Sequence, residues 1–350
     1  MRPLTLGVLV SAAPERSTAP ETRESTSPPV RGAASPEGSP LSTAQSAGLD
    51  PVARESAVDL ESAADLCAAL RDLGHRAHPI AVTRDLDLSL RHFDIDACLL
   101  ALHGPKGGRG EVQSLLTMRG VPFAGPEATA VALAFDKVRA RQLLNFHNLP
   151  VPPSILLGRG SKTQDRDLEL LGWPCYVKPR RGALGQGVTF LDHVDRVPEA
   201  LEAALRIDRE VVLERALPGQ EIQVVLLGDR VLGSLEVLSR QASGVHETVC
   251  PPTLSRTRLQ GIHGLARRAV HALGLENGWT RVDVLVDERL NEFVLEVEPL
   301  PPLHRDGVVA RVAAAHGLGY AALVQQLLDR IVLRAPAHPD LLPAPVPVLQ

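Results

Sequence analysis

Two short strings near the C-terminus, RVD at 281–283 and EVE at 296–298, decide the fold expected of this chain. Each lies in a run in which apolar and polar residues alternate, and a polar segment rich in turn-forming residues separates the runs. Such alternation predicts two strands of a β-hairpin, because successive side chains of a strand point to opposite faces. A loop of about four residues around 288–291 would pair the two strings in antiparallel order.

This pairing sets Asp283 opposite Glu296 and Arg281 opposite Glu298, with all four side chains on one face. Carboxylates that close repel one another unless a cation lies between them, and Mg²⁺ is commonly held by carboxylates, water and substrate phosphates. We therefore interpret the hairpin as a platform for Mg²⁺ (or Mn²⁺) whose ligands are Asp283, Glu296 and Glu298. A solvated polar face of an amphipathic hairpin explains the two strands equally well when they are considered alone.

A glycine-rich segment far upstream adds a second candidate site. Lys178 follows a short apolar strand at 175–177, and Arg181, Gly185 and Gly187 come shortly after it. Glycines let the backbone approach an anion closely, and successive N–H groups can form an anion-binding concavity. The same composition is typical of a surface turn, and the spacing matches neither the P-loop nor the Rossmann fingerprint. This segment alone therefore favours a turn, whereas its combination with the hairpin favours phosphate binding.

Taken in order, the motifs of this chain resemble those of the ATP-grasp superfamily and, within it, of the D-alanine–D-alanine ligases. The similarity extends from about Glu55 to about Leu328. Its strongest segments are LHG at 102–104, GEVQ at 110–113, GVPFAG at 120–125, AFDK at 134–137 and LPVPP at 149–153. The resemblance implies an α/β (α+β) ATP-grasp fold with a Rossmann-like N-terminal domain, a central α+β subdomain and a C-terminal antiparallel-sheet domain.

The resemblance also implies a nucleotide site. Its cofactors would be ATP and two Mg²⁺ (or Mn²⁺) ions held by the hairpin carboxylates. Lys137 and Lys178 would contact the ATP phosphates, Glu214 the adenine side and Glu221 the ribose. Arg181, Gly185 and Gly187 belong to the glycine-rich loop expected to cover the phosphates.

Three further residues match substrate-binding positions of the ligases. Glu55 aligns with the glutamate that anchors the ammonium of the first D-alanine, Arg281 with the arginine that binds the second substrate and the developing oxyanion, and His103 with a histidine near the first substrate. Taken singly, Glu55 is better explained as a charge at a helix N-terminus and His103 as a hydrogen-bonded loop residue. The resemblance favours the substrate role for Arg281 and Glu55 and supports it less for His103.

The chain also departs from the family pattern, mainly on the amino-acid side of the site. At the metal side, Glu298 replaces an asparagine, which keeps an oxygen ligand and adds charge. Leu184 and Gly185 replace a serine pair, and the segment 245–249 replaces a longer lid loop, so that a short polar turn is expected there. Pro302 stands where the family has a glycine, which removes a backbone N–H that contacts the substrate carboxylate. The ATP and metal positions are intact by comparison.

The expected activity is an ATP-dependent carboxylate–amine ligation of the D-alanine–D-alanine ligase type, through an acyl phosphate, that joins two D-alanines for peptidoglycan precursor synthesis. Two alternatives stay open: an ATP-grasp ligase for a different amino or hydroxy acid pair, and a non-catalytic nucleotide-binding homologue. The expected partners are small amino acids, and a homodimer is expected from the family alone.

Composition agrees with a cytoplasmic enzyme. The chain has 350 residues, 44% of them hydrophobic, a net charge of −4 and 3% aromatic residues, which argues against nucleic acid as a partner. The four cysteines form no CxxC pair, which favours reduced thiols. The apolar run 4–10 has the outline of a short secretory signal, but we interpret it as the first strand. No run approaches the ~20 apolar residues of a membrane helix.

We expect four regions along the chain. They are an N-terminal substrate-binding α/β domain over 1–125 with a disordered insertion at 12–51, a central ATP-grasp subdomain over 126–217, a C-terminal subdomain with the metal site over 218–335, and a loose tail over 336–350. Helices are predicted over 56–73, 128–145, 256–273 and 307–332 from their apolar spacing.

Overall fold

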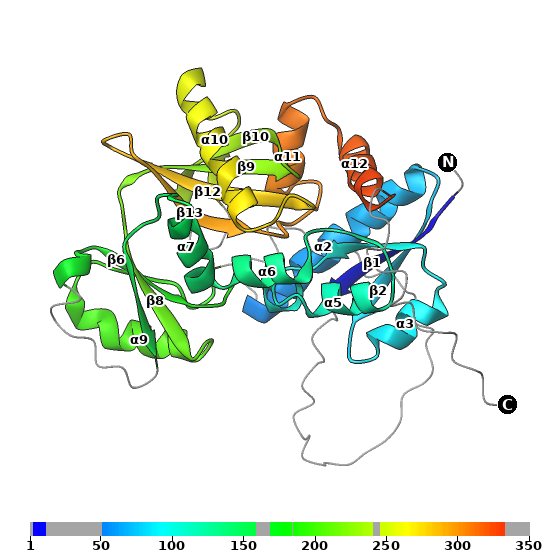
Figure 1. Ribbon diagram of the computed structural model, residues 1–350, viewed down its shortest axis with the longest axis horizontal. Helices are drawn as coiled ribbons and strands as arrows, with labels where there is room; N and C mark the ends of the chain where they lie inside the picture. Colours follow the sequence, from blue (N-terminus) through cyan, green and yellow to red (C-terminus); the bar gives the residue numbers. More distant parts are fainter. Residues whose placement is uncertain (1–2, 12–50, 159–168, 184, 241–245, 333–350) are drawn as a thin grey trace, which may run out of the picture.

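The computed structural model describes residues 3–11, 51–158, 169–183, 185–240 and 246–332, and it contains three sheets (Figure 1). The predicted insertion at 12–51 lies outside the described residues except for its last residue, which is helical. Leu184, Val245 of the shortened lid and the tail over 336–350 also lie outside them. The expectations for these segments therefore stay predictions.

The first sheet is parallel and has the order β2-β1-β3-β4. Its strands are β1 (Thr5–Ser11), β2 (Arg76–Val82), β3 (Ala97–Ala101) and β4 (Phe123–Ala124). The apolar run at the N-terminus is therefore a strand, as predicted, and all seven residues of β1 are buried. A parallel sheet needs helices on its faces, and the helices of this region are α2 (Pro51–Asp72), α3 (Leu86–His92), α4 (Gly104–Gly108) and α5 (Glu111–Met118).

Helix α2 begins at Pro51, five residues before the predicted start at 56. Proline is favoured in the first turn of a helix because the N–H that it lacks would have no intrahelical partner there. The extension places Glu55 inside the helix rather than before it.

A break at Asp136 divides the predicted helix over 128–145 into α6 (Ala128–Phe135) and α7 (Lys137–Phe146). Asp136 has an extended backbone with ψ 98°, and its carboxylate accepts hydrogen bonds from the N–H groups of Val138 and Arg139. The prediction of one helix was wrong because a helix-capping residue lies inside an otherwise helical pattern. The break puts Lys137 at the first position of α7.

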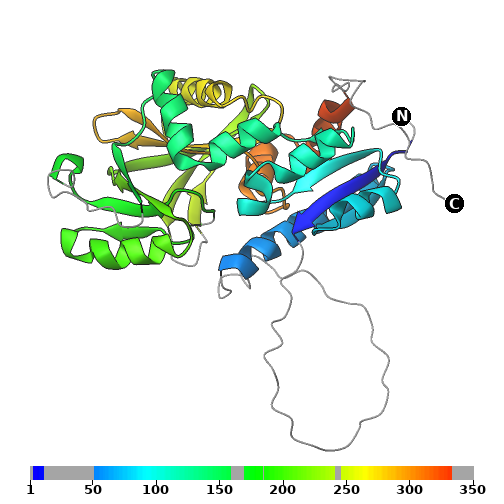
Figure 2. The ribbon, with the colours of Figure 1, turned by 60° about the horizontal axis from the view of Figure 1, so that its bottom comes forward.

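The central sheet is antiparallel and has the order β5-β8-β6-β7. Its strands are β5 (Ser154–Gly158), β6 (Cys175–Pro179), β7 (Thr189–Leu191) and β8 (Glu210–Arg215). The short η1 (Val194–Arg196) leads into α9 (Val197–Leu205), which packs on this sheet through a small apolar core of its own. Figure 2 shows this unit beside, and separate from, the N-terminal sheet.

The C-terminal sheet has the order β11-β10-β9-β12-β13 and carries the predicted hairpin. Its strands are β9 (Gly219–Leu227), β10 (Arg230–Arg240), β11 (His246–Val249), β12 (Trp279–Asp287) and β13 (Glu292–Glu298). Helix α10 (Arg256–Ala272) confirms the helix predicted over 256–273, and it covers one face of the sheet. The polar turn expected over 245–249 was wrong, because His246–Val249 pairs with β10 as an edge strand.

Two helices, α11 (Val308–Ala315) and α12 (Tyr320–Val332), replace the single closing helix predicted over 307–332. They meet at 108° around Gly317, whose φ of +79° is a left-handed conformation that ends helices. No single helix among the described residues is long and apolar enough to span a membrane, and only α11 and α12 together, as this bent pair, pass that test of length and composition.

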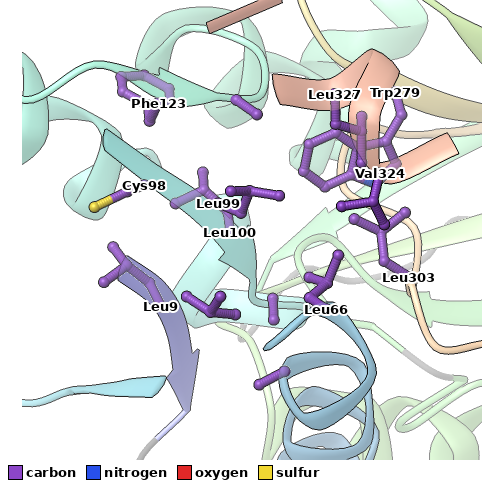
Figure 3. Close-up of a cluster of buried hydrophobic side chains, with 14 of the residues drawn as sticks. Leu9, Leu66, Cys98, Leu99, Leu100, Phe123, Trp279, Leu303, Val324 and Leu327 are labelled. Atoms are coloured by element: carbon purple, nitrogen blue, oxygen red, sulfur yellow. The ribbon is translucent and has the colours of Figure 1, made fainter. Parts of the chain in front are cut away.

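The largest apolar core joins the two ends of the chain. Figure 3 shows one cluster that contains Leu9 and Leu99 of the parallel sheet, Leu66 of α2, Trp279 of β12 and Val324 of α12. All five side chains are almost completely buried. The N-terminal sheet is thus packed against the C-terminal helices, which places the loops after its strands near the end of β13.

Candidate active site

The hairpin has the predicted register where the charged residues lie. Arg281 pairs with Glu298 and Asp283 with Glu296 in the antiparallel ladder of β12 and β13. A bulge follows directly, because Val284 pairs with Val294 and the ladder skips Leu295. The bulge bends the strand and reverses which side chains face the core beyond it.

Arg281 and Asp283 form a buried ion pair on this face. Nε of Arg281 lies 2.7 Å and its Nη2 3.1 Å from the two carboxylate oxygens of Asp283. Burial raises the pKa of Asp283 above its ordinary value, and Glu221 and Glu296 add to this rise against the opposing charge of Arg281. The pKa of Glu298 is also raised by burial. The face therefore holds more carboxylates than its own arginine neutralises.

Lys137 supplies a second cation to the carboxylates. Its Nζ lies 3.1 Å from Oε1 of Glu296 and donates to the carbonyl oxygen of Gly182 at 3.0 Å. Burial alone would raise the pKa of Glu296, but Lys137, Arg281 and Lys178 outweigh it and lower the pKa to about 2. Lys137 thus connects α7, the glycine-rich loop (residues 180–187) and the hairpin.

Glu214 is a buried charge centre on β8. Its Oε1 lies 2.9 Å from Nζ of Lys178, and its Oε2 contacts Nη2 of Arg141. The two predicted ATP residues Lys178 and Glu214 are therefore paired with each other in this structure. Glu221, the predicted ribose residue, is buried on the neighbouring sheet, where Gln223 donates to its Oε1 at 3.4 Å.

The glycine-rich loop adopts conformations that favour glycine at both predicted positions. Gly185 has φ +73° and Gly187 φ +63°, values that other residues rarely adopt. A Cβ atom at Gly187 would lie 2.5 Å from Cδ1 of Ile207, whereas one at Gly185 would meet nothing within 4 Å. Arg181 pairs with Asp136 at 3.0 Å and Asp208 at 3.5 Å, so its guanidinium is tied to two carboxylates.

The two predicted substrate residues of the N-terminal region lie together. The Glu55 carboxyl packs on Gly104, so closely that a Cβ there would lie 2.5 Å from the carboxyl carbon. Burial and Asp59 raise the pKa of Glu55 to about 7. Burial lowers the pKa of His103, but Asp59, Glu298 and Glu55 reverse this and raise it overall. Glu298 therefore couples the hairpin electrostatically to Glu55 and His103.

The donor chemistry of the hairpin fits Mg²⁺ together with phosphates rather than a closed metal cage. In the part of the chain that the structure describes, no group of three or more His, Cys, Asp or Glu side chains is arranged to hold a metal ion by itself. Mg²⁺ usually keeps several waters and is bound through one or two carboxylates plus substrate phosphates. The predicted ligands Asp283, Glu296 and Glu298 are therefore not gathered as a set of three, and an Mg²⁺ ion would use one or two of them together with phosphates.

A cleft of about 910 Å³ borders the glycine-rich loop. It is lined by residues of α4, α6, the start of α7 and the segment 207–209, and it includes Arg181 and Gly182. Lys137, Glu214 and Glu296 do not line it. The cleft thus touches the loop but not the paired charges, and we place the candidate chemistry at the charges because they bring cations and carboxylates together.

Sequence reasoning missed several charged residues that shape the site. Asp136 binds Arg180 at 2.7 Å and caps α7, and its position directly before Lys137 was a capping signal. Asp59 follows Glu55 by one helical turn, so both face the same side, which was a detectable pattern. Arg141 reaches Glu214 across 73 residues of sequence, and no local pattern indicates that contact.

Comparisons with known proteins agree with this arrangement. The family described as D-ala D-ala ligase C-terminus matches residues 143–329. A D-alanine–D-alanine ligase of Geobacter sulfurreducens is 33% identical over 284 residues, covering 78% of this chain and 89% of that protein. One from Gloeobacter violaceus is 34% identical over 295 residues, covering 81% and 97%.

A solved structure supports the same fold. The D-alanine–D-alanine ligase of Bacillus anthracis, crystallised with ATP, superposes with a TM-score of 0.74 at 22% identity and covers 94% of this chain and 97% of its own. The mixed architecture of a parallel sheet and two antiparallel sheets is therefore the ATP-grasp fold. With relatives above 30% identity over most of its length, the chain belongs to the D-alanine–D-alanine ligase family.

Proposed function

We propose that this protein is an ATP-dependent ligase that joins two D-alanines through an acyl phosphate. The observation that carries the proposal is the approach of charged residues from distant parts of the chain. Glu298 of the hairpin lies close enough to Glu55 and His103 of the N-terminal region for its charge to raise the pKa of both. An amino-acid site and a phosphate site would thus share one border, as a reaction between them requires.

The nucleotide side would use the residues around the hairpin. Lys137 and Lys178 carry the charge to bind ATP phosphates. They are paired with Glu296 and Glu214, respectively, and the phosphates would compete with these carboxylates for the two lysines. Asp283, Glu296 and Glu298 would hold two Mg²⁺ (or Mn²⁺) ions. When bound, these ions neutralise charge on the transferred phosphoryl group.

The amino-acid side would use the N-terminal residues. The carboxylate of the first D-alanine attacks the γ-phosphorus of ATP, which forms an acyl phosphate and releases ADP. The amine of the second D-alanine then attacks the acyl carbon and expels phosphate, losing a proton as the peptide bond forms. Glu55 would anchor the first ammonium, and Arg281 would stabilise the oxyanion of the tetrahedral intermediate.

One departure favours a second candidate, a ligase for a different amino or hydroxy acid pair. Pro302, which follows β13, cannot donate a backbone hydrogen bond to an acceptor carboxylate. An acceptor held by other donors would tolerate this proline, whereas D-alanine would bind less tightly.

We further propose that the product serves peptidoglycan precursor synthesis, that the enzyme acts in the cytoplasm and that it pairs as a homodimer.

The test is ADP release by the purified protein with Mg²⁺-ATP, first with D-alanine and then with a panel of D- and L-amino acids and hydroxy acids. D-alanyl-D-alanine identified by mass, with one ADP per dipeptide, is the expected result. Release only with another acid pair would move the assignment to the second candidate. ATP binding without ADP release across the whole panel would overturn both and identify a non-catalytic nucleotide-binding protein.

A further inference from the structure

Asp59 of helix α2 is a buried carboxylate beside the amino-acid site. It lies one helical turn after Glu55, so the two acids share a face of α2. Asp59 has no exposed surface. A fully buried carboxylate costs several kcal/mol unless hydrogen bonds and a cation compensate it, so its contacts should explain why it is there.

Both carboxylate oxygens of Asp59 are engaged. Oδ2 accepts a hydrogen bond from the hydroxyl of Ser11, and Oδ1 contacts Nδ1 of His103. Ser11 is the last residue of β1, and His103 follows β3 and begins α4 as its N-cap. Side chains at the carboxyl ends of parallel strands surround the usual ligand position of such sheets. The chain Ser11–Asp59–His103 therefore lies at the edge where a substrate would bind.

This contact determines the state of the His103 ring. An ionised carboxylate can only accept hydrogen bonds, so Nδ1 of His103 must carry the hydrogen. The other nitrogen, Nε2, makes no hydrogen bond to any described residue. In a histidine, the hydrogen bond made by one ring nitrogen determines the state of the other nitrogen, which is the one available for chemistry. Here the available nitrogen is Nε2.

Hydrogen bonding alone does not require a charge at position 59. An asparagine could accept from His103 through Oδ1 and donate to Ser11 through its amide, with nearly the same shape. The carboxylate differs in two respects, because it accepts from both neighbours and because its charge favours an imidazolium. The charged groups that face His103 are Asp59 and Glu55 of α2 and Glu298 of β13, all acidic, and His304 lies nearby. The surroundings of His103 therefore favour a cation.

We propose that Asp59 is a positioning residue of the amino-acid site, which holds His103 as an Nδ1–H donor so that Nε2 is presented to the carboxylate or acyl oxygen of the first substrate beside Glu55. The inference rests on the proposed ligase function. It assigns to this chain a carboxylate–histidine pair whose purpose is to orient the ring. His103 would then act directly on the substrate, and Asp59 would act through His103.

The first experiment observes the ring without any assay. In a ¹⁵N-histidine-labelled full-length protein, long-range ¹H–¹⁵N spectra distinguish protonated from unprotonated ring nitrogens, and His103→Gln identifies the His103 signals. We expect Nδ1 to be protonated throughout pH 6–8 in the wild type, and D-alanine to shift the Nε2 signal. An unprotonated Nδ1, or an Nε2 signal that saturating D-alanine leaves unchanged, would overturn the proposal.

The second experiment measures Asp59→Asn by steady-state kinetics. We expect kcat for ADP release to fall about 10- to 100-fold, with little change in the KM for ATP. We also expect the imidazolium of His103 to lose its proton at a lower pH than in the wild type, because the charge of Asp59 no longer raises its pKa. The matched control is Asp65→Asn on the same helix, whose carboxylate binds the backbone N–H of Arg305 at 2.7 Å. A loss of kcat equal in both variants, or none in Asp59→Asn, would contradict the role of Asp59.

The two proposals fail in different ways. A wild-type protein that releases no ADP with any acid on the panel would refute the ligase assignment, whatever the state of His103. An active wild-type protein whose His103 leaves Nδ1 unprotonated would leave the ligase assignment intact and refute the role of Asp59. If Asp59→Asn does not fold, the wild-type spectra alone decide the question.

Discussion

The Nζ atom of Lys137 lies 3.1 Å from Oε1 of Glu296, which joins the first residue of α7 to the hairpin of the C-terminal sheet. The lysine reaches this position only because the helix begins afresh after Asp136. The same ammonium binds the carbonyl oxygen of Gly182. One side chain thus contacts both the glycine-rich loop and the hairpin carboxylates. Substitutions at either partner should therefore change the rate of ADP release.

We expect Glu296→Gln to reduce Mg²⁺-dependent ADP release by at least about 100-fold. The carboxylate would hold the metal ion, and the ion stabilises the charge of the transition state by several kcal/mol. Asp283→Asn should have an effect of similar size. The control is Glu292→Gln on the same strand, whose partner is Arg258 at 3.1 Å. Near-wild-type rates in both site variants, with unchanged circular dichroism, would remove the metal assignment.

Glu214→Ala should lower the free energy of unfolding by about 3–5 kcal/mol, because it leaves the cations of Lys178 and Arg141 in a buried site without their shared partner. Urea denaturation provides the measurement. Glu202→Ala serves as the comparison, since its pair with Arg206 is exposed and should contribute less than about 1 kcal/mol. Equal losses of unfolding free energy in the two variants would mean that Lys178 and Arg141 do not depend on Glu214 for compensation of their buried charges.

The raised pKa of Glu55 predicts a pH dependence of stability. Its pKa is about 7 in the folded chain, whereas the ordinary pKa of a glutamate, which applies to the unfolded chain, is 4.5. Between these two values the folded state binds more protons than the unfolded state. Stability from this group is fully present below pH 4.5 and is lost as the pH rises through about 7.

Glu55→Gln should therefore gain stability relative to wild type on going from pH 5 to pH 8, by an amount on the order of 1 kcal/mol. Thermal or urea denaturation at the two pH values measures it. The substitution Glu61→Gln on the same helix tests whether the effect belongs to Glu55. A difference between Glu55→Gln and wild type that does not change with pH would show that the carboxyl titrates normally.

Gly187→Ala should destabilise the protein more than Gly185→Ala. Both residues have a positive φ, which costs a residue with a Cβ roughly 1–2 kcal/mol. At Gly187 the new methyl also collides with Ile207, whereas the space at Gly185 is open. Adding Ile207→Ala should recover part of the extra loss, and a double-mutant cycle would show this coupling. Additive losses would place the strain in the backbone alone.

The hairpin was predictable because alternation and a short turn determine its register locally. A four-residue loop with regular pairing gives the pairs Asp283–Glu296 and Arg281–Glu298, and both are found. The outer half is nevertheless shifted by one residue, since Val286 pairs with Glu292, and the bulge restores the predicted pairing. The same reasoning could not find the bulge, since that requires knowing that both Val294 and Val297 pack into the core under α10. Periodicity indicates a strand but not an interruption of its pairing.

The helix breaks show that apolar periodicity alone is not enough. An apolar pattern continues across Asp136 and across Gly317, so a single helix was predicted at each place. Capping by Asp136 and the left-handed conformation of Gly317 are local signals that end a helix, and the periodicity concealed both. The pairing of Glu214 with Lys178 and Arg141 depends on tertiary structure alone, and sequence offers chemistry for these residues but no partners.

The bulge between Asp283 and Val284 has a consequence for how this site can vary. Leu295 is the extra residue, and it lets Val294 and Val297 both face the core while Glu296 stays aligned with Asp283. The pairing of residues 281–283 with 296–298 is therefore separated by the bulge from the pairing nearer the tip of the hairpin. Insertions or deletions in the tip at 288–291 would change the reach of the hairpin without turning the carboxylates away, so the tip is the place where a loop can be exchanged or a tag grafted.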